Sequence, residues 1–164
     1  MTKRLLIVWH SMTGGTRQMA EAAARGAGGE AGIMVRLLHA AAAAPADVLA
    51  ADAYLFATPE NLAAMAGMAK DFFDRCYYPA LGRVEGRPYA VMVCAGSDGT
   101  SAVRQIERIA TGWRLRAVAP PIIVCTRAQT PEAILAPKTI PAAELDRCAE
   151  LGAALAAGLA MGIF

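Results

Sequence analysis

The sequence predicts an α/β protein in which a five-stranded parallel sheet is covered by helices on both faces. Short apolar runs alternate with helical periodicities along all 164 residues. The strand-like runs are apolar throughout, as expected for strands buried on both faces. Hydrophobic residues make up 56% of the chain and charged residues 18%, which favours a large core over disorder. No linker-like stretch divides the chain, so we expect one domain over residues 1–164.

The first half of the chain contains three predicted strands and one predicted helix. Met19, Ala23 and Ala27 recur at the helical period, and the pair Gly28-Gly29 ends that helix. The run of alanines at 40–44 predicts a connection without chemistry of its own. In chain order the expected elements are a strand at 4–9 (RLLIVW), a helix at 15–27, a strand at 33–38 and a strand at 52–59 (DAYLFATP).

The second half continues the alternation. Its expected elements are a helix at about 64–77, a strand at 87–96 (RPYAVMVCAG), a helix at 100–113, a strand at 114–126, and a last helix that Pro141 opens after a proline-rich loop. The helix at 64–77 should bury Ala64, Met68, Phe72 and Cys76 and carry the charge pairs Lys70–Asp74 and Asp71–Arg75. Pro120-Pro121 interrupts the last strand. Because proline cannot donate to a ladder, this strand should lie at an edge or be broken.

Charge and composition exclude several functions. The net charge is only +2, so no basic stripe for nucleic acid is expected. With only two histidines, no zinc site can be built from the usual spacings. The apolar runs near both ends are too short for a signal-peptide core or a membrane span. The four cysteines lack CxxC spacing, so we expect reduced thiols in a soluble, cytoplasmic protein: Cys76, Cys94, Cys125 and Cys148.

The loop after the first strand, SMTGGT at residues 11–16, predicts a phosphate site. It joins a strand to a helix at the carboxyl edge of the sheet, where amide groups and the helix dipole favour an anion. Its hydroxyls add donors, and its glycines let the backbone approach closely. The loop has no lysine, so it is not a Walker A loop. The cluster at 26–29 closes the helix, which excludes a Rossmann GxGxxG. A single terminal phosphate, held by hydrogen bonds alone, is the expected ligand.

At this point the sequence resembles a known family. Ser11-Met12-Thr13-Gly14-Gly15-Thr16 is similar to the [ST]xTGxT phosphate loop of flavodoxin-like proteins. Residues 51–75 and 91–100 (VMVCAGSDGT) resemble the later flavin-contacting segments of that family. The resemblance implies a doubly wound sandwich with strand order 2-1-3-4-5 and FMN as the cofactor. The residues expected to bind it are Ser11, Met12, Thr13, Gly14, Gly15, Thr16, Pro59, Glu60, Asn61, Leu62, Ala63, Ala95, Gly96, Ser97, Asp98 and Gly99.

Related folds suggest different functions. A response-regulator receiver would need acidic residues at the ends of strands one and three, where this chain has Trp9-His10 and Thr58-Pro59. Electron-carrying flavodoxins are usually acidic and hold the flavin between aromatic side chains. This chain is slightly basic, and residues 60–67 and 95–100 contain no aromatic residue. It therefore resembles NAD(P)H-dependent FMN reductases and NAD(P)H:quinone oxidoreductases more closely than carriers.

In that interpretation the partners are NAD(P)H and a quinone-like acceptor, and the resemblance to quinone reductases implies assembly into a dimer or tetramer. No catalytic side chain and no metal are expected, since the flavin performs the chemistry. A flavodoxin-type electron carrier is the alternative, and a flavin-binding module without turnover is a third. Small side chains at Ala63, Ala64 and Gly67 would leave one face of the flavin open to a donor or acceptor.

Several residues have two interpretations from the sequence. Glu60 and Asn61 could contact the flavin ring or cap the next helix. Asp98 could be a turn residue or contact the cofactor. His10 could lie near the acceptor or be structural. Tyr77 and Tyr78 could form an aromatic wall or pack at the end of the helix. Four arginines could bind the NADPH phosphates or form a solvated surface: Arg104, Arg108, Arg114 and Arg116.

Overall fold

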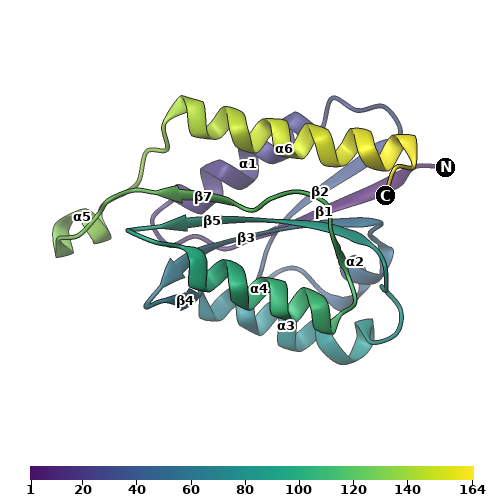
Figure 1. Ribbon diagram of the computed structural model, residues 1–164, viewed down its shortest axis with the longest axis horizontal. Helices are drawn as coiled ribbons and strands as arrows, with labels where there is room; N and C mark the ends of the chain where they lie inside the picture. Colours follow the sequence, from purple (N-terminus) through teal and green to yellow (C-terminus); the bar gives the residue numbers. More distant parts are fainter.

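Strands and helices alternate as the sequence predicts (Figure 1). The computed structural model describes residues 1–164. Its elements are β1 (Lys3–Trp9), α1 (Gly15–Ala27), β2 (Ile33–His39), α2 (Pro45–Ala50), β3 (Ala53–Asn61), β4 (Ala64–Met65), α3 (Gly67–Ala80), β5 (Pro88–Ala95), α4 (Thr100–Gly112), β6 (Arg116–Ala117), β7 (Ile122–Cys125), α5 (Pro131–Leu135) and α6 (Ala142–Met161). None of these helices is both long and apolar enough to cross a membrane.

The sheet has the predicted topology. β1 pairs in parallel with β2 and β3, and β3 pairs in parallel with β5. β6 and β7 both pair in parallel with β5 and are two pieces of one edge strand. The break between them contains Pro120-Pro121, which confirms the interrupted edge strand. The order across the sheet is β2-β1-β3-β5 followed by the edge strand of β6 and β7. When the five parallel strands are numbered along the chain, this is the predicted order 2-1-3-4-5. The carboxyl ends of all these strands therefore meet at one edge.

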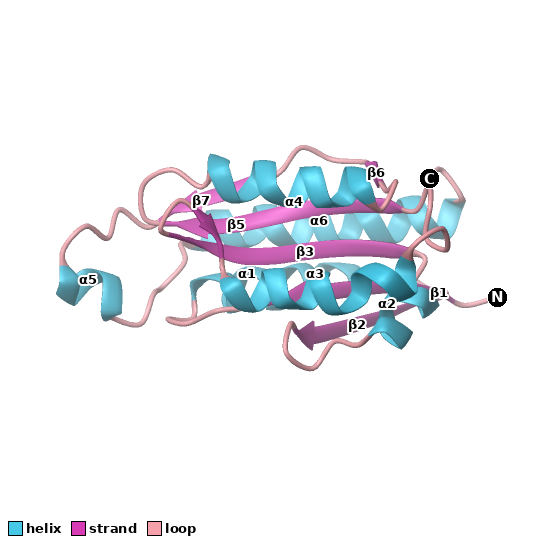
Figure 2. Cartoon of the chain, turned by 90° about the horizontal axis from the view of Figure 1, so that it is seen from below, coloured by secondary structure: helices cyan, strands magenta, loops and turns pink.

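Helices cover both faces of the sheet (Figures 1 and 2). α1 and α6 lie on one face, over a core of aliphatic and small residues. They approach so closely that a Cβ on Gly152 would lie 2.0 Å from the carbonyl oxygen of Ala23. α2, α3 and α4 lie on the other face. There the core is aromatic, with Phe56 of β3 against Phe73 and Trp113 at ring-centroid distances of 5.0 and 6.5 Å.

The helix predicted at 64–77 begins later than expected. Residues 64 and 65 form β4, an antiparallel partner of β3, and α3 begins at Gly67. Ala64 is therefore not helical, and Met68 is 38% exposed rather than buried. The buried positions of α3 are Ala69, Phe72, Phe73, Cys76 and Ala80. The predicted ion pairs Lys70–Asp74 and Asp71–Arg75 are present at 2.6 and 2.7 Å.

Two short helices lie in segments expected to be connections. α2 follows the alanine run, and α5 lies within the proline-rich loop. Each begins with a proline at its first turn, where the missing N–H has no cost. Asp47 accepts a hydrogen bond from the backbone of Ala44, and Thr130 accepts one from Ala133. Their local caps, rather than an apolar period, start these helices. α5 projects beyond the carboxyl ends of the strands (Figure 1).

Candidate functional site

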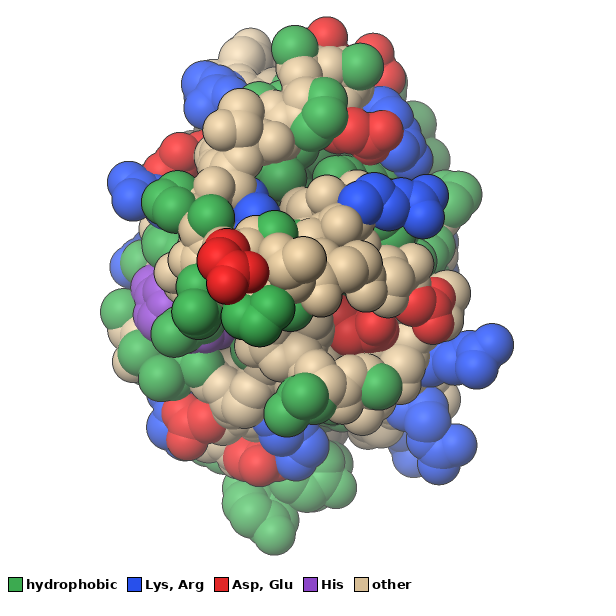
Figure 3. Space-filling model, turned by 90° about the vertical axis from the view of Figure 1, so that its left-hand side faces the viewer, with side chains coloured by type: hydrophobic (Ala, Val, Ile, Leu, Met, Phe, Trp, Pro, Cys, Tyr) green, Lys and Arg blue, Asp and Glu red, His purple; other side chains and the backbone are tan.

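A cavity of about 380 Å³ opens at the carboxyl ends of β1, β3, β5 and β7. Figure 3 shows this edge of the molecule, where most Lys and Arg side chains lie near the outline of the face rather than at its centre. Segments from four separate parts of the chain form the cavity. Its lining is Ser11, Met12, Thr13, Gly15, Thr16, Pro59, Glu60, Asn61, Cys94, Ala95, Gly96, Thr126, Ala128, Ile134, Leu135 and Lys138.

One end of the cavity, the first-loop end, is formed by residues 11–16. Gly14 has φ +93°, a left-handed conformation that glycine adopts without strain, and its N–H donates to Ser11 Oγ at 3.0 Å. This turn places the first amide groups of α1 at the cavity. Gly15 packs so tightly that a Cβ there would lie 2.7 Å from Cys94 Sγ. The loop therefore has no room for a side chain at position 15.

Thr16 carries an unsatisfied hydroxyl at this end. The residue is 1% exposed and lines the cavity, yet Thr16 Oγ1 has no hydrogen-bond partner in the protein. A buried hydroxyl without a partner is costly and rare in native structures. An acceptor bound in the cavity would satisfy it. Together with the glycine turn and the helix amides, this donor set fits a phosphate group.

The opposite end, the hairpin end, is formed by the β3–β4 hairpin. Leu62 and Ala63 form its turn with φ values of 51° and 59°, a backbone conformation that residues other than glycine rarely adopt. Leu62 is fully exposed. The hairpin is tied to α4, because Gln105 Oε1 accepts a hydrogen bond from the N–H of Met65 at 2.8 Å. The strained turn is thus held in place by its neighbours.

Glu60 connects the hairpin end to the loop after β5. Its two carboxylate oxygens accept hydrogen bonds from Gly99 N at 2.9 Å and from Ala102 N at 3.0 Å. Both donors belong to the N-terminus of α4, whose partial positive charge favours a carboxylate. Glu60 therefore caps α4, whereas the capping interpretation expected it to cap the next helix, α3, which has no side-chain cap. Asn61, by contrast, is exposed at the cavity.

The loop at 95–99 contributes mainly its backbone. Asp98 Oδ1 accepts from Thr100 Oγ1 at 2.8 Å and from the N–H of Thr100 at 3.3 Å, the turn geometry expected of aspartate. Gly99 has φ +89°, and a Cβ there would lie 2.6 Å from Ile123 Cγ2. Only Ala95 and Gly96 of this loop line the cavity.

The structure brings most of the expected binding residues together. Those that line the cavity are Ser11, Met12, Thr13, Gly15, Thr16, Pro59, Glu60, Asn61, Ala95 and Gly96. Gly14, Leu62, Ala63, Ser97, Asp98 and Gly99 lie in the same loops but outside the lining. Their binding role stays a prediction, and for several of them the structure already shows a role in shaping the turn.

Sequence reasoning missed the segment after β7. Thr126, Ala128, Ile134, Leu135 and Lys138 all line the cavity. We call residues 126–140 the arm. The position of the arm after the last parallel strand was the available signal, since every such strand ends at the ligand-binding edge. Proline content instead suggested a plain loop.

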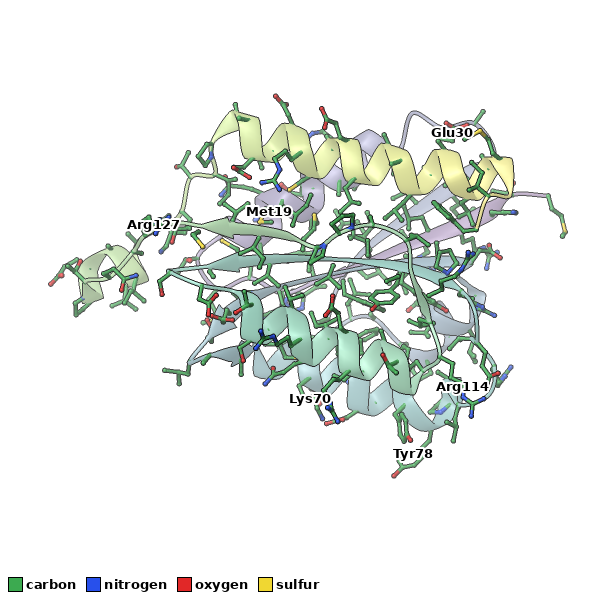
Figure 4. The ribbon with its side chains drawn as sticks, viewed as in Figure 1. Met19, Glu30, Lys70, Tyr78, Arg114 and Arg127 are labelled. Atoms are coloured by element: carbon green, nitrogen blue, oxygen red, sulfur yellow. The ribbon has the colours of Figure 1, made fainter.

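Other candidates are not among the residues that line the cavity. His10 Nδ1 and His39 Nε2 are 3.0 Å apart, and burial together with His39 lowers the pKa of His10 from its usual 6.5. His10 is not among the lining residues. Tyr77 and Tyr78 pack on each other at the end of α3. In Figure 4, Tyr78 and Arg114 lie at the end of the molecule opposite Arg127.

Fold and site together define a flavodoxin-like protein whose first loop carries donors that fit a phosphate group. Residues 10–130 match the family of NADPH-dependent FMN reductases. The chain therefore belongs to that family, and FMN is its cofactor.

Individual relatives agree with this assignment. The chain is 32% identical to a flavodoxin from Aquifex aeolicus over 96 residues, or 58% of this chain and 52% of that one. It is 33% identical to an NAD(P)H dehydrogenase (quinone) from Acidithiobacillus ferrooxidans over 92 residues, or 44% and 46% of the two chains. The chain thus spans about half the length of the curated relatives it matches.

Solved structures share the fold. An archaeal flavodoxin superposes with a TM-score of 0.77 at 18% identity, covering 96% of this chain and 99% of that one. The WrbA-like flavodoxin from Agrobacterium tumefaciens gives 0.74 at 19% identity, covering 98% and 99%. At these identities the likeness shows the architecture alone.

Proposed function

We propose that the protein is an oxidoreductase that takes two electrons from NAD(P)H through FMN and passes them to a quinone or a similar acceptor. The observation that carries this proposal is the absence of any aromatic side chain from the cavity lining. An aromatic ring against the flavin would occupy a face on which a nicotinamide or a quinone must stack. This cavity leaves that space free.

The walls of the cavity suit a flat, largely apolar partner. Ile134 and Leu135 of α5 line the cavity and are 51% and 77% exposed. Met12 contributes a third apolar side chain that is 76% exposed. Exposed apolar groups gathered at a cavity are typical of a binding site for an apolar ligand.

The side chains of the site position the cofactor rather than react. Ser11, Thr13 and Thr16 offer hydroxyls to its phosphate, and Glu60 keeps the hairpin and the α4 loop together. Burial raises the pKa of the Cys94 thiol to about 11, so this cysteine stays protonated and is not a nucleophile. When bound, FMN supplies the hydride chemistry.

Arg127 is our candidate for recognition of the NADPH phosphates. It lies between two lining residues, Thr126 and Ala128, is exposed, and has no ion-pair partner. Its φ of 62° is a left-handed conformation, held by the hydrogen bond from its N–H to the carbonyl of Gly96 at 2.8 Å. Arg114, for which the sequence left both a phosphate site and a solvated surface open, is exposed and faces Glu85 at 3.7 Å.

The test is anaerobic addition of NADPH or NADH to the FMN-loaded protein, followed by benzoquinone. Loss of the yellow oxidised-flavin absorbance on adding either nicotinamide, and its return with benzoquinone, are the expected results. A protein that neither nicotinamide bleaches would contradict the proposal and support a flavodoxin-type carrier. Arg127→Gln should raise KM for NADPH with little change for NADH, whereas Arg114→Gln is the matched control without effect.

A further inference from the structure

We propose that Lys138 pairs with the phosphate of the cofactor and makes the site selective for phosphorylated flavin. The first loop contains no cation, and hydrogen bonds alone were expected to hold the phosphate. Folding brings a lysine to that loop from the far end of the chain. The inference rests on FMN as the cofactor and is independent of which electron donor or acceptor the protein uses.

The backbone of Lys138 is fixed against the first loop. Its N–H donates to the carbonyl of Thr13 at 2.8 Å. Its carbonyl accepts from Gln18 Nε2 at 2.7 Å, and Gln18 Oε1 accepts from the N–H of Ile140 at 3.0 Å. A Cβ built on Gly15 would lie 3.6 Å from the Cβ of Lys138. The lysine side chain therefore starts directly beside the loop and lines the same cavity.

The ammonium group of Lys138 has a donor to spare and no anionic partner. Nζ donates to the carbonyl oxygens of Ile134 and Ala136 at 2.8 and 2.6 Å. An ammonium group has three protons, so one remains. No carboxylate lies within ion-pair distance of Lys138. Glu60, the one acidic residue of the cavity lining, uses both oxygens on backbone amides at the hairpin end.

Thr16 points independently to the same ligand. Its hydroxyl is buried at the first-loop end of the cavity and lacks a partner. A phosphate oxygen would accept from Thr16, and the negative charge of the phosphate would compensate the ammonium of Lys138. Charge-assisted hydrogen bonds of this kind are about twice as strong as neutral ones. The unpartnered hydroxyl of Thr16 and the remaining proton of the Lys138 ammonium belong to residues that line one cavity, so one anionic group can accept from both.

A merely structural role for Lys138 makes a different prediction. If Nζ serves only to hold the carbonyls at the end of α5, its removal should loosen the arm. Binding of FMN and of riboflavin would then weaken equally. Riboflavin lacks the phosphate, so the two flavins separate a phosphate contact from a general effect on the cavity.

The experiment measures the dissociation constants of FMN and riboflavin for the apoprotein by flavin fluorescence. Lys138→Met keeps most of the length of the side chain and removes the charge. It should raise the dissociation constant of FMN about tenfold or more and change that of riboflavin less than about twofold. Lys138→Arg should restore most of the FMN affinity. The matched control is Lys3→Met, because Lys3 Nζ also donates to a carbonyl, that of Leu159, at 3.0 Å.

Salt provides the second readout. The dissociation constant of FMN should rise with NaCl less steeply in Lys138→Met than in the unaltered protein, because one screened charge pair is gone. Thermal melting checks that each variant folds, with Lys138→Gln as the replacement if the methionine variant does not. Equal loss of both flavins, or no loss of FMN, would overturn the role of Lys138. Either result leaves the proposed oxidoreductase activity standing, since that activity is tested by nicotinamide addition.

Discussion

The two ends of the cavity are built in opposite ways. The inner part of the first-loop end is buried and tight, with Thr16 at 1% exposure and Gly15 packed against Cys94. The hairpin end is open, with Leu62 fully exposed at the tip of a two-residue turn. The first end is connected to the core and to the arm by backbone hydrogen bonds. The second is held mainly by the side chains of Glu60 and Gln105.

We infer from this difference that the first-loop end binds the cofactor and that the hairpin end serves the reaction. Preformed donors at the first-loop end can hold a phosphate without reorganisation, which favours affinity. In the proposed reaction the hairpin end admits a second molecule, and a site filled by the protein's own side chains could not do so. We therefore expect changes at the first-loop end to discriminate between FMN and riboflavin. Changes at the hairpin end should affect both flavins alike.

The largest effect is expected from Gly15→Ala. The added methyl group would lie 2.7 Å from Cys94 Sγ, and Cys94 is buried, so neither side chain can move away easily. Overpacking of this kind lowers the free energy of unfolding by about 1–3 kcal/mol, as measured by urea denaturation. Cys94→Ala in the same chain should recover most of the loss. A double variant as unstable as Gly15→Ala alone would contradict the steric explanation.

Glu60→Gln should come next. The amide keeps one acceptor oxygen but turns an NH₂ group toward a backbone N–H of α4 and removes the charge at the helix N-terminus. The free energy of unfolding should fall by about 1–2 kcal/mol. The affinities for FMN and riboflavin should fall by the same factor, as measured by fluorescence titration. Glu107→Gln, on the same helix, serves as the control. A loss of affinity for FMN without a matching loss for riboflavin would contradict the different roles assigned to the two ends.

Thr16→Val sharpens the comparison from the other end. Valine has the shape of threonine but lacks the unsatisfied oxygen. Without a ligand, the variant should be more stable than the unaltered protein by about 1 kcal/mol, because an unpaired buried hydroxyl is removed. FMN affinity should nevertheless fall about tenfold, with riboflavin unchanged. An apoprotein destabilised by the change would show that Thr16 already has a partner.

The smallest effect concerns pH at the histidine pair beside the first loop. The N–H of Ala41 donates to His39 Nδ1, so the proton of a neutral His39 is on Nε2 and points to His10 Nδ1. A proton on His10 Nδ1 would oppose that donor, consistent with the lowered pKa of His10.

Because the folded protein holds this proton less tightly than the unfolded chain, stability should fall as the pH drops below about 6.5 toward the lowered pKa. Urea denaturation of the unaltered protein and of His10→Asn between pH 7.5 and pH 5 measures this contribution. The two pH profiles should diverge on the acid side. Parallel profiles would exclude His10 as the titrating group.

Periodicity and loop chemistry explain why so much of the fold was predictable. The apolar runs located every strand of the parallel sheet, and Pro120-Pro121 located the break in the edge strand. α3 was misplaced at its start because the left-handed turn at Leu62-Ala63 uses residues that do not normally signal one. The short helices α2 and α5 depend on single caps rather than on a repeating pattern.

By itself, the amino-acid sequence determined the parallel α/β architecture, the glycines and hydroxyls of the first loop and the absence of aromatic residues from the loops at 60–67 and 95–100. These are local properties, readable from neighbouring residues. Tertiary structure decided that Lys138 lies beside Thr13, that Glu60 caps α4, and that Ile134 and Leu135 form a wall of the cavity. Those contacts join segments far apart in the chain, and only the convergence of the strand ends at one edge brings them together.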